Sequence, residues 1–404
     1  MIGWSGRRKT LTILAFIAPT LLGITVFSIY PLLLNVFISL TDRGKFHPNP
    51  DCSNSLWNIV EPTCWLGEPP RGLAEPFGFQ TPIFENYVDL LGGLFTRESL
   101  LALLFLAVAL LPILAAWYVN RRFSRRSNFP VSSGVVWLLG LAGTMLLGWL
   151  INVPDQYQML LESGDFIMVN ARTILYVMIC IPLFFVVGLI MALILNNDFL
   201  RGKTFFRVIL IVPWAASNVS IMMTLVWQFF FRQQGTINQI LSAVLTSYEG
   251  PAFLNRTLWA WFAVVLVNLY YTYPFFMVTL LGGLQSIPLE LYEAAEVDGA
   301  TWWKQLTNIT LPLLRPVALP IVVLSSLTTY KVDAVVWALT QGGPTAGAGK
   351  PGGTEFVMVH AYKQIFQTQA FGRMGAFAVI LFIGLFAATL YSLRLTRITE
   401  GAYE

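Results

Sequence analysis

The sequence predicts an all-α integral membrane protein with eight transmembrane helices. Of its 404 residues, 56% are hydrophobic and only 11% are charged, against about 45–50% and about 25% in soluble domains. Too little polar surface remains to cover a water-facing globule. The apolar residues gather in runs close to the ~20 residues that cross a bilayer as a helix. These runs are 11–34, 100–119, 135–151, 173–195, 208–231, 258–281, 316–339 and 371–393.

Basic residues recur after every second run. Because lysine and arginine concentrate in cytoplasmic loops, this pattern predicts that the amino and carboxyl termini are both cytoplasmic. The net charge of +4 follows from these residues and does not indicate nucleic-acid binding. The basic positions are Arg7, Arg8, Lys9, Arg121, Arg122, Arg125, Arg126, Arg201, Lys203, Arg207, Lys304, Arg315, Arg394 and Arg397.

The first run follows basic residues, as the apolar part of a signal peptide does. It is longer than the 7–15 residues of such a segment, and no A-x-A cleavage site follows it. We therefore expect a retained helix. The topology then places residues 41–96 outside the cell, with Cys52 and Cys64 in one loop. Two cysteines in an oxidising compartment can form a disulfide, and two free thiols are the alternative. Cys180, inside an apolar helix, is expected to be a small core residue.

The chain divides into two predicted regions. Residues 1–170 hold the first helix, the external loop and an accessory transmembrane hairpin at 100–151, whose spans carry almost no hydrogen-bonding side chains. Residues 171–397 form a core of five spans with many polar features, including a cytoplasmic loop at 285–315.

No catalytic, metal or nucleotide site is expected. Gly349-Lys350 lacks the earlier glycine and the following Ser or Thr of a phosphate-binding loop, because Pro344 and Pro351 occupy those positions. His47 and His360 lie far apart, and no Cys/His cluster has metal-ligand spacing. We expect no catalytic residue, no metal and no cofactor on this chain, so active transport would need a partner or an ion gradient.

The loop between the sixth and seventh runs predicts a short helix over 289–298. Pro288 suits the first turn of a helix, and Gly299 stands where a left-handed stop is expected. Three glutamates at spacing i, i+3 and i+6 accompany a small surface at Ala294 and Ala295. Such a helix can occupy a groove of another protein; the alternative is a solvated acidic connector.

A longer pattern follows from this helix. Glu293-Ala294-Ala295, then Gly299, Ile309 and Leu311-Pro312 reproduce the EAA signature of permease subunits of ATP-binding-cassette (ABC) importers. The sequence resembles most the sugar-importer permeases of the maltose-transporter type, from Asn170 to Arg397. Supporting segments are Phe205-Phe206-Arg207, Pro213-Trp214, Gly235-Thr236-Ile237-Asn238 and Thr340-Gln341-Gly342-Gly343-Pro344.

The resemblance implies a type I importer permease in the bacterial inner (plasma) membrane. Its partners would be a second similar permease, two copies of a cytoplasmic ATPase that holds ATP and Mg, an external solute-binding protein and membrane lipid. The helix at 289–298 would be the coupling helix that docks in the ATPase. The accessory hairpin and the longer first external loop depart from the family's usual pattern.

Polar residues in three spans share one depth. Polar groups at the bilayer midplane are costly unless they face a partner or a cavity. Amides and hydroxyls beside aromatic rings match a neutral sugar, so we predict a substrate pathway there; the alternative is hydrogen bonding between helices, worth about 0.6 kcal/mol per pair. The candidates are Asn218 in the fifth span, Asn268, Tyr270 and Tyr271 in the sixth, and Ser325, Thr328 and Thr329 in the seventh.

Two charged residues lie near the outer end of the seventh span. Lys331 and Asp333, at i and i+2, point to different faces and are not expected to pair. Lys331 can snorkel to the external surface on its long stem. Intramembrane charges also suit the main rival, an ion-coupled secondary transporter, which does not explain the EAA pattern. A membrane anchor or scaffold would not explain the polar residues at one depth.

Overall fold

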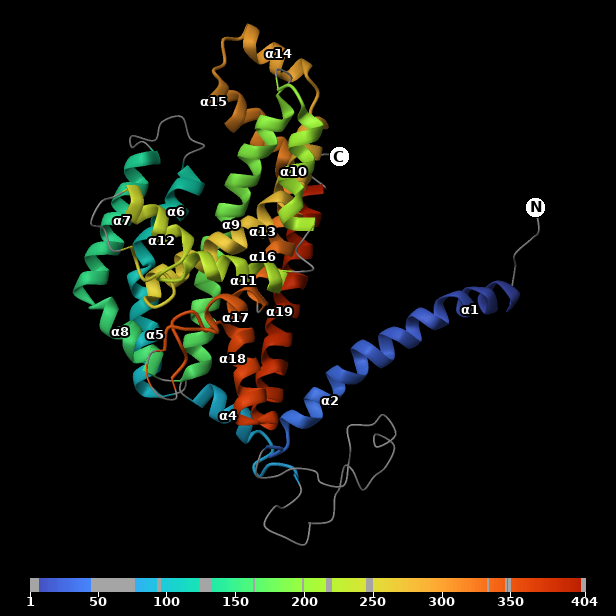
Figure 1. Cartoon of the computed structure of the whole chain (residues 1–404), viewed down its shortest axis with the longest axis vertical. Helices are drawn as coiled ribbons and strands as arrows, with labels where there is room; N and C mark the ends of the chain where they lie inside the picture. The colour runs from blue at the N-terminus through green and yellow to red at the C-terminus, as the bar shows by residue number, and fades with distance from the viewer. Residues whose placement is uncertain are drawn as a thin grey trace. The chain divides into compact units, whose positions relative to one another are not determined.

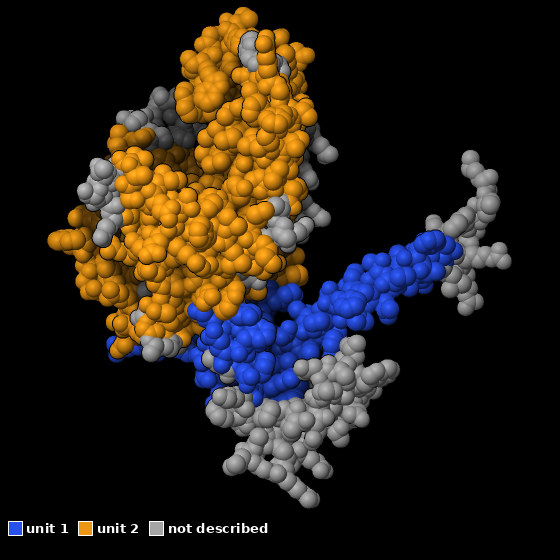
Figure 2. All heavy atoms as spheres, in the orientation of Figure 1, with its two compact units in different colours: residues 1–97, 361–384 blue, residues 98–360, 385–404 orange. Residues whose placement is uncertain are grey.

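The computed structural model describes residues 7–44, 77–92, 96–123, 133–162, 164–197, 200–215, 220–244, 250–332, 334–345, 347 and 350–400. Within these residues the chain is helical, apart from turns and an isolated antiparallel bridge between Thr41 and Phe79. Cys52 and Cys64 lie outside the described residues, so their disulfide stays a prediction. The chain divides into two compact units, residues 1–97 with 361–384 and residues 98–360 with 385–404 (Figure 2).

Helices of very different length follow one another along the chain, and η marks a π-helical turn (Figure 1). In order they are α1 (Arg7–Ile24), η1 (Thr25–Ile29), α2 (Tyr30–Ser39), α4 (Glu85–Leu91), α5 (Arg97–Ala109), α6 (Leu111–Phe123), α7 (Ser133–Leu150), α8 (Val153–Glu162), α9 (Asp165–Asn196), α10 (Lys203–Ala215), α11 (Ser220–Phe231), α12 (Thr236–Val244), α13 (Thr257–Gln285), α14 (Glu290–Val297), α15 (Trp302–Gln305), η5 (Leu306–Thr310), α16 (Leu311–Tyr330), α17 (Ala334–Thr340), α18 (Val357–Lys363), η6 (Gln364–Thr368) and α19 (Phe371–Glu400).

Six helical stretches of the described residues are long and apolar enough to cross a membrane. The count is seven if α7 and α8, bent by 68° at their junction, form one span. Two of the eight predicted runs are not among the six: 135–151 falls on α7, and 208–231 falls on α10 and α11, with residues 216–219 outside the described part of the chain. The six stretches are Thr12–Ser39, Arg97–Arg122, Asp165–Asn196, Thr257–Gln285, Trp302–Tyr330 and Phe371–Ser392.

The first unit is held by hydrogen bonds between α4 and the end of α2. The Asn86 side chain is buried, and its Nδ2 donates to the backbone oxygens of Ser39 and Thr41, both at 2.9 Å. The guanidinium of Arg43 lies over the rings of Phe77 and Phe371, and burial lowers the pKa of Arg43. These contacts order the chain that follows the first apolar helix.

The second unit is organised around α9 and α13, which pack along one another. Their buried faces supply large side chains to one hydrophobic core, among them Tyr176 and Phe184 from α9 and Phe276 from α13. The helices approach closely at Gly188, where a Cβ atom would lie 2.5 Å from the Cβ of Phe276. Interiors packed at this density leave no room for an added side chain.

Substituting valine for Gly188 is therefore expected to destabilise the protein. Forcing added methyl groups into a packed core costs roughly 1–3 kcal/mol, so the midpoint of thermal unfolding in detergent should fall. The control is Gly282→Val on α13, where a Cβ would meet nothing within 4 Å. Equal midpoints for the two variants would contradict the close packing of α9 and α13.

Candidate functional site

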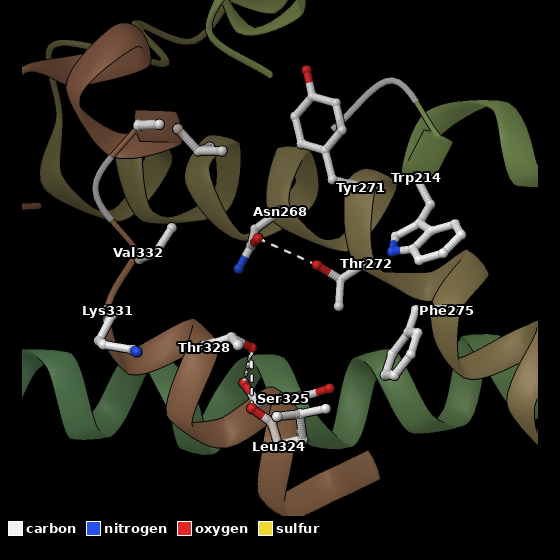
Figure 3. A pocket seen from close by; sticks show the side chains of 12 residues that line it. Trp214, Asn268, Tyr271, Thr272, Phe275, Leu324, Ser325, Thr328, Lys331 and Val332 are labelled. Carbon is white, nitrogen blue, oxygen red and sulfur yellow. Dashed lines mark hydrogen bonds between the residues drawn. The ribbon is translucent and has the colours of Figure 1, made fainter. Parts of the chain in front are cut away.

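A cavity of about 420 Å³ lies inside the second unit, where α13 faces the end of α16 (Figure 3). One face of α13 and one face of α16 supply most of its wall, and the end of α10 and the start of α17 complete it. The residues that line it are Trp214, Asn268, Tyr271, Thr272, Phe275, Leu324, Ser325, Thr328, Lys331, Val332, Ala334 and Val335.

The α13 wall follows the helical repeat. Asn268, Tyr271, Thr272 and Phe275 stand at i, i+3, i+4 and i+7, so they project from one face of the helix. The Asn268 side chain is only 7% exposed, and its Oδ1 accepts a hydrogen bond from the Thr272 hydroxyl at 3.4 Å. Its Nδ2 has no hydrogen-bond partner among the described residues. Figure 3 shows this nitrogen turned away from Thr272, toward the side of the cavity where Thr328 and Lys331 lie.

An unsatisfied donor at this depth is costly. Leaving a buried polar group without a partner costs about 1–3 kcal/mol, and native proteins rarely keep one without a reason. The Tyr176 hydroxyl is also buried without a hydrogen bond of normal geometry in the described part of the chain, and it lies near the Cys180 thiol and the Asn268 side chain. The α13 wall of the cavity therefore holds hydrogen-bonding capacity that the described residues do not use.

The α16 wall presents hydroxyl oxygens and one ammonium group. The Thr328 hydroxyl donates to the backbone oxygens of Ser325 at 3.0 Å and Leu324 at 3.2 Å, which leaves its oxygen free to accept. Ser325 is buried within the helix. Lys331 follows the last residue of α16, and Figure 3 shows its amine directed toward Thr328.

Aromatic rings form the opposite part of the lining. Trp214 at the end of α10 stacks on Phe275, with ring centroids 6.1 Å apart and planes at 27°. The Tyr273 hydroxyl donates to the backbone oxygen of Leu210 at 3.3 Å and joins α13 to α10. Amides and hydroxyls on one side and flat rings on the other suit a solute with hydroxyl groups and C–H faces.

The structure brings four of the seven predicted pathway residues together in this lining: Asn268, Tyr271, Ser325 and Thr328. Tyr270 is not part of it and packs against Trp227, with centroids 5.4 Å apart. Thr329 is buried elsewhere in the helix packing, with 5% exposure. Asn218 and Asp333 lie outside the described residues.

Sequence reasoning missed the other eight lining residues, four of which are polar, charged or aromatic. Thr272 and Phe275 could have been found from the helical repeat that starts at Asn268. Trp214 was noted only as part of a Pro-Trp pair. Lys331 was considered only as a side chain that snorkels to the external surface; the structure leaves it exposed and also places it in the wall of the cavity. Its position depends on where α16 ends, which the continuous apolar run did not reveal.

The second candidate site is the loop between α13 and α16. Its helix α14, Glu290–Val297, lies inside the predicted range 289–298. Gly299 has φ +71°, as the predicted left-handed stop requires. The Gly299 N–H donates to the oxygen of Glu296 at 3.0 Å, and the Ala300 N–H donates to that of Ala295 at 2.8 Å. This bond pair is the Schellman motif that ends helices.

The EAA pattern separates into an exposed part and an anchored part. No residue of α14 is buried: Glu293 and Ala294 are exposed, and Ala295 is half-buried. Val297 beside them is 89% exposed. An apolar and acidic surface of this kind can receive another protein.

The anchored part follows α15. Ile309, Leu311 and Pro312 are half-buried, and Leu311 packs against the hydrophobic core. The Tyr292 hydroxyl on α14 bonds that of Thr310 at 2.9 Å. The exposed helix is thus tied to the base of α16, the helix that lines the cavity.

Comparison with known proteins identifies the family. Residues 185–398 match the family described as the binding-protein-dependent transport system inner membrane component. The chain belongs to this family. Its members' description, together with the apolar helices, makes the chain a multi-pass membrane protein of the bacterial inner membrane.

Two relatives are ABC permeases by name. The chain is 30% identical over 250 residues to a probable ABC transporter permease protein of Brucella suis, covering 62% of this chain and 83% of that protein. It is also 30% identical over 242 residues to the maltose/maltodextrin transport system permease protein MalF of Vibrio vulnificus, covering 58% of this chain and 46% of the relative. The chain thus spans about half of that MalF. The recognised resemblance to ABC sugar-importer permeases is confirmed.

A solved structure shares the fold. A chain of a bacterial alginate ABC transporter, crystallised in complex with an alginate pentasaccharide-bound periplasmic protein, superposes with a TM-score of 0.50. The match covers 71% of this chain and 96% of that chain at 20% identity. The all-helical ABC permease architecture follows from this likeness.

Among the described residues, no group of His, Cys, Asp and Glu could hold a metal ion.

Proposed function

We propose that this chain is the permease subunit of an ABC importer that carries a di- or oligosaccharide or a glucoside across the inner membrane. The observation that carries the proposal is the cavity in which the hydrogen-bonding side chains of α13 and α16 lie across from the Trp214–Phe275 ring pair. Such clefts, with few polar groups and apolar walls, are the usual form of small-molecule sites. The MalF relative is named for maltose and maltodextrin transport, which supports a sugar.

Energy for this transport would come from outside the chain. We propose that α14 docks in a cytoplasmic ATPase, which holds ATP and Mg, and that residues Glu293, Ala294, Ala295 and Gly299 form the contact. The absence of any buried residue in α14 supports this role. The anchoring through Ile309, Leu311 and Pro312 would pass the movement of α14 to α16 and so to the cavity.

The proposed assembly contains this chain, a second similar permease, two copies of the ATPase and an external solute-binding protein. The structural neighbour was crystallised with a periplasmic binding protein, which supports the last of these. The predicted eight spans and cytoplasmic termini belong to the same proposal. They place α14 and the ATPase on one side of the membrane.

One observation favours the rival hypothesis of an ion-coupled secondary transporter. The Lys331 ammonium lines the cavity, and charged groups inside membrane proteins often mark ion pathways. The exposed EAA helix has no role in such a transporter.

Purification of the tagged chain from its native membrane separates the two. The importer hypothesis expects an ATPase and a second permease in the eluate, with ATP hydrolysis that rises when sugar and binding protein are added. A matched preparation of Glu293→Lys should recover less ATPase. A chain that elutes alone and takes up sugar only under an ion gradient would support the secondary transporter instead.

A further inference from the structure

We propose that Lys331 makes the cavity selective for sugars that carry a carboxylate, such as a uronate-containing disaccharide. The inference rests on the proposed permease function and names the substrate class of the same cavity. The amides, hydroxyls and rings of the spans predicted a neutral sugar. The position of Lys331 in the lining changes that expectation.

Lys331 reaches the cavity because the helix ends beside it. Its φ of −91° and ψ of 17° leave the helical region, its N–H donates to the oxygen of Thr329, and α17 begins only at Ala334. Ser325, Thr328 and Lys331 stand at successive i+3 positions, so they follow one face of α16. Figure 3 shows the amine on the same side as Thr328 and the Asn268 amide.

Lys331 carries the only formal charge among the described lining residues. The structure records no ion pair or hydrogen bond between its ammonium and any described residue. Lys331 is exposed and follows the last residue of the apolar stretch Trp302–Tyr330, so its ammonium is accessible to a solute in the cavity. A carboxylate on the solute would supply the missing partner.

The hydrogen-bonding groups of the cavity that have no partner also favour a carboxylate on the solute. Asn268 Nδ2 is an unused donor, and an ammonium has three donors and no acceptor. The hydroxyls of Thr272 and Thr328 already donate to acceptors of the protein. Lys331 and Asn268 therefore place donors on one side of the cavity, and an ionised carboxylate accepts only. Bonds to charged groups are also stronger and shorter than neutral ones.

The test is direct binding to the purified transporter complex without its external binding protein, so that the preference of that protein does not enter. Quenching of tryptophan fluorescence reports binding of two probes: a disaccharide that ends in glucuronate, and the same disaccharide with glucose in its place. We expect the glucuronate form to bind about 10- to 100-fold more tightly, because hydrogen bonds to charged groups contribute more to the binding free energy than neutral ones do.

Three variants assign the preference to Lys331. Lys331→Gln should weaken binding of the glucuronate probe about 10- to 100-fold and leave the glucose probe unchanged, while Lys331→Arg should keep the preference. The matched control is Lys350→Gln, an exposed lysine outside the lining. It should bind both probes like the wild type.

Asp333 lies outside the described residues, and Asp333→Asn tests whether it neutralises Lys331. The preference should persist in this variant; a preference that appears only in Asp333→Asn would overturn the inference. So would equal binding of both probes by the wild type. In that case, a loss of binding in Asn268→Leu would show that the cavity still serves as the sugar site. Binding of neither probe, with Asn268→Leu indistinguishable from wild type, would contradict the proposed function itself.

Discussion

Substituting proline for Gly299 is expected to abolish coupled transport while the protein still inserts into the membrane. Gly299 has φ +71°, and the proline ring fixes φ near −65°. The substitution also removes the N–H that bonds Glu296 and disfavours the helical backbone of the preceding residue. Proline at this position is expected to destabilise the conformation of the loop by about 3 kcal/mol, which lowers the population of that conformation roughly 100-fold. We expect sugar uptake by proteoliposomes to fall by at least that factor.

The control at the same position is Gly299→Asn. A Cβ at Gly299 would meet nothing within 4 Å, so only the backbone conformation limits the substitution, and asparagine tolerates the left-handed region. Uptake should stay near that of the wild type. Glu293→Lys tests the exposed surface, because it reverses a charge without altering a buried contact. Unchanged uptake in both Gly299→Pro and Glu293→Lys would rule out the coupling role of α14.

The Asn268→Leu variant is expected to lose sugar binding without losing stability. Leucine has a similar size but no Nδ2 donor, so a bound hydroxyl or carboxylate loses its partner, at about 1–3 kcal/mol or roughly 5- to 100-fold in affinity. The same donor is unsatisfied in the structure. Its removal relieves a buried polar group and offsets the loss of the weak 3.4 Å bond from Thr272.

Affinity and stability are measured on the same preparations, by tryptophan fluorescence and by thermal unfolding. The control is Thr279→Val on the same helix: its hydroxyl bonds the Phe275 backbone, and it lies outside the lining. It should retain wild-type affinity. Normal sugar binding by Asn268→Leu would show that the amide does not contact the solute. A much lower unfolding temperature, with affinity reduced only as far as the folded fraction is reduced, would show that the amide has a structural role.

Local signals in the sequence were sufficient to predict part of this structure. Helix α14 is an example: proline before it and glycine after it set its limits, and the structure gives α14 and Gly299 as predicted. Those limits depend on backbone conformations and hydrogen bonds within about ten residues. The same holds for the long apolar spans, whose length and composition are visible without their neighbours.

The positions at which helices end inside the apolar runs could not be predicted from local signals. The run 208–231 reads as one span but forms α10 and α11, and the run 316–339 contains the end of α16 and the start of α17. Residues near the described end of α10 and at the end of α16 line the cavity. A helix in an apolar environment ends where packing and a cavity allow its backbone to be satisfied, and that information comes from other segments of the chain.

The sequence by itself determined the membrane class, the approximate spans and the family pattern, and it predicted a shared depth for the polar residues. Only the tertiary structure decided which of these residues face the cavity, because depth follows from position along a helix while direction follows from packing. Tyr271 lines the cavity and its neighbour Tyr270 does not, since one residue turns a helix by about 100°. Packing of α10 against α13 brings Trp214 to Phe275, and the end of α16 brings Lys331 to the same cavity.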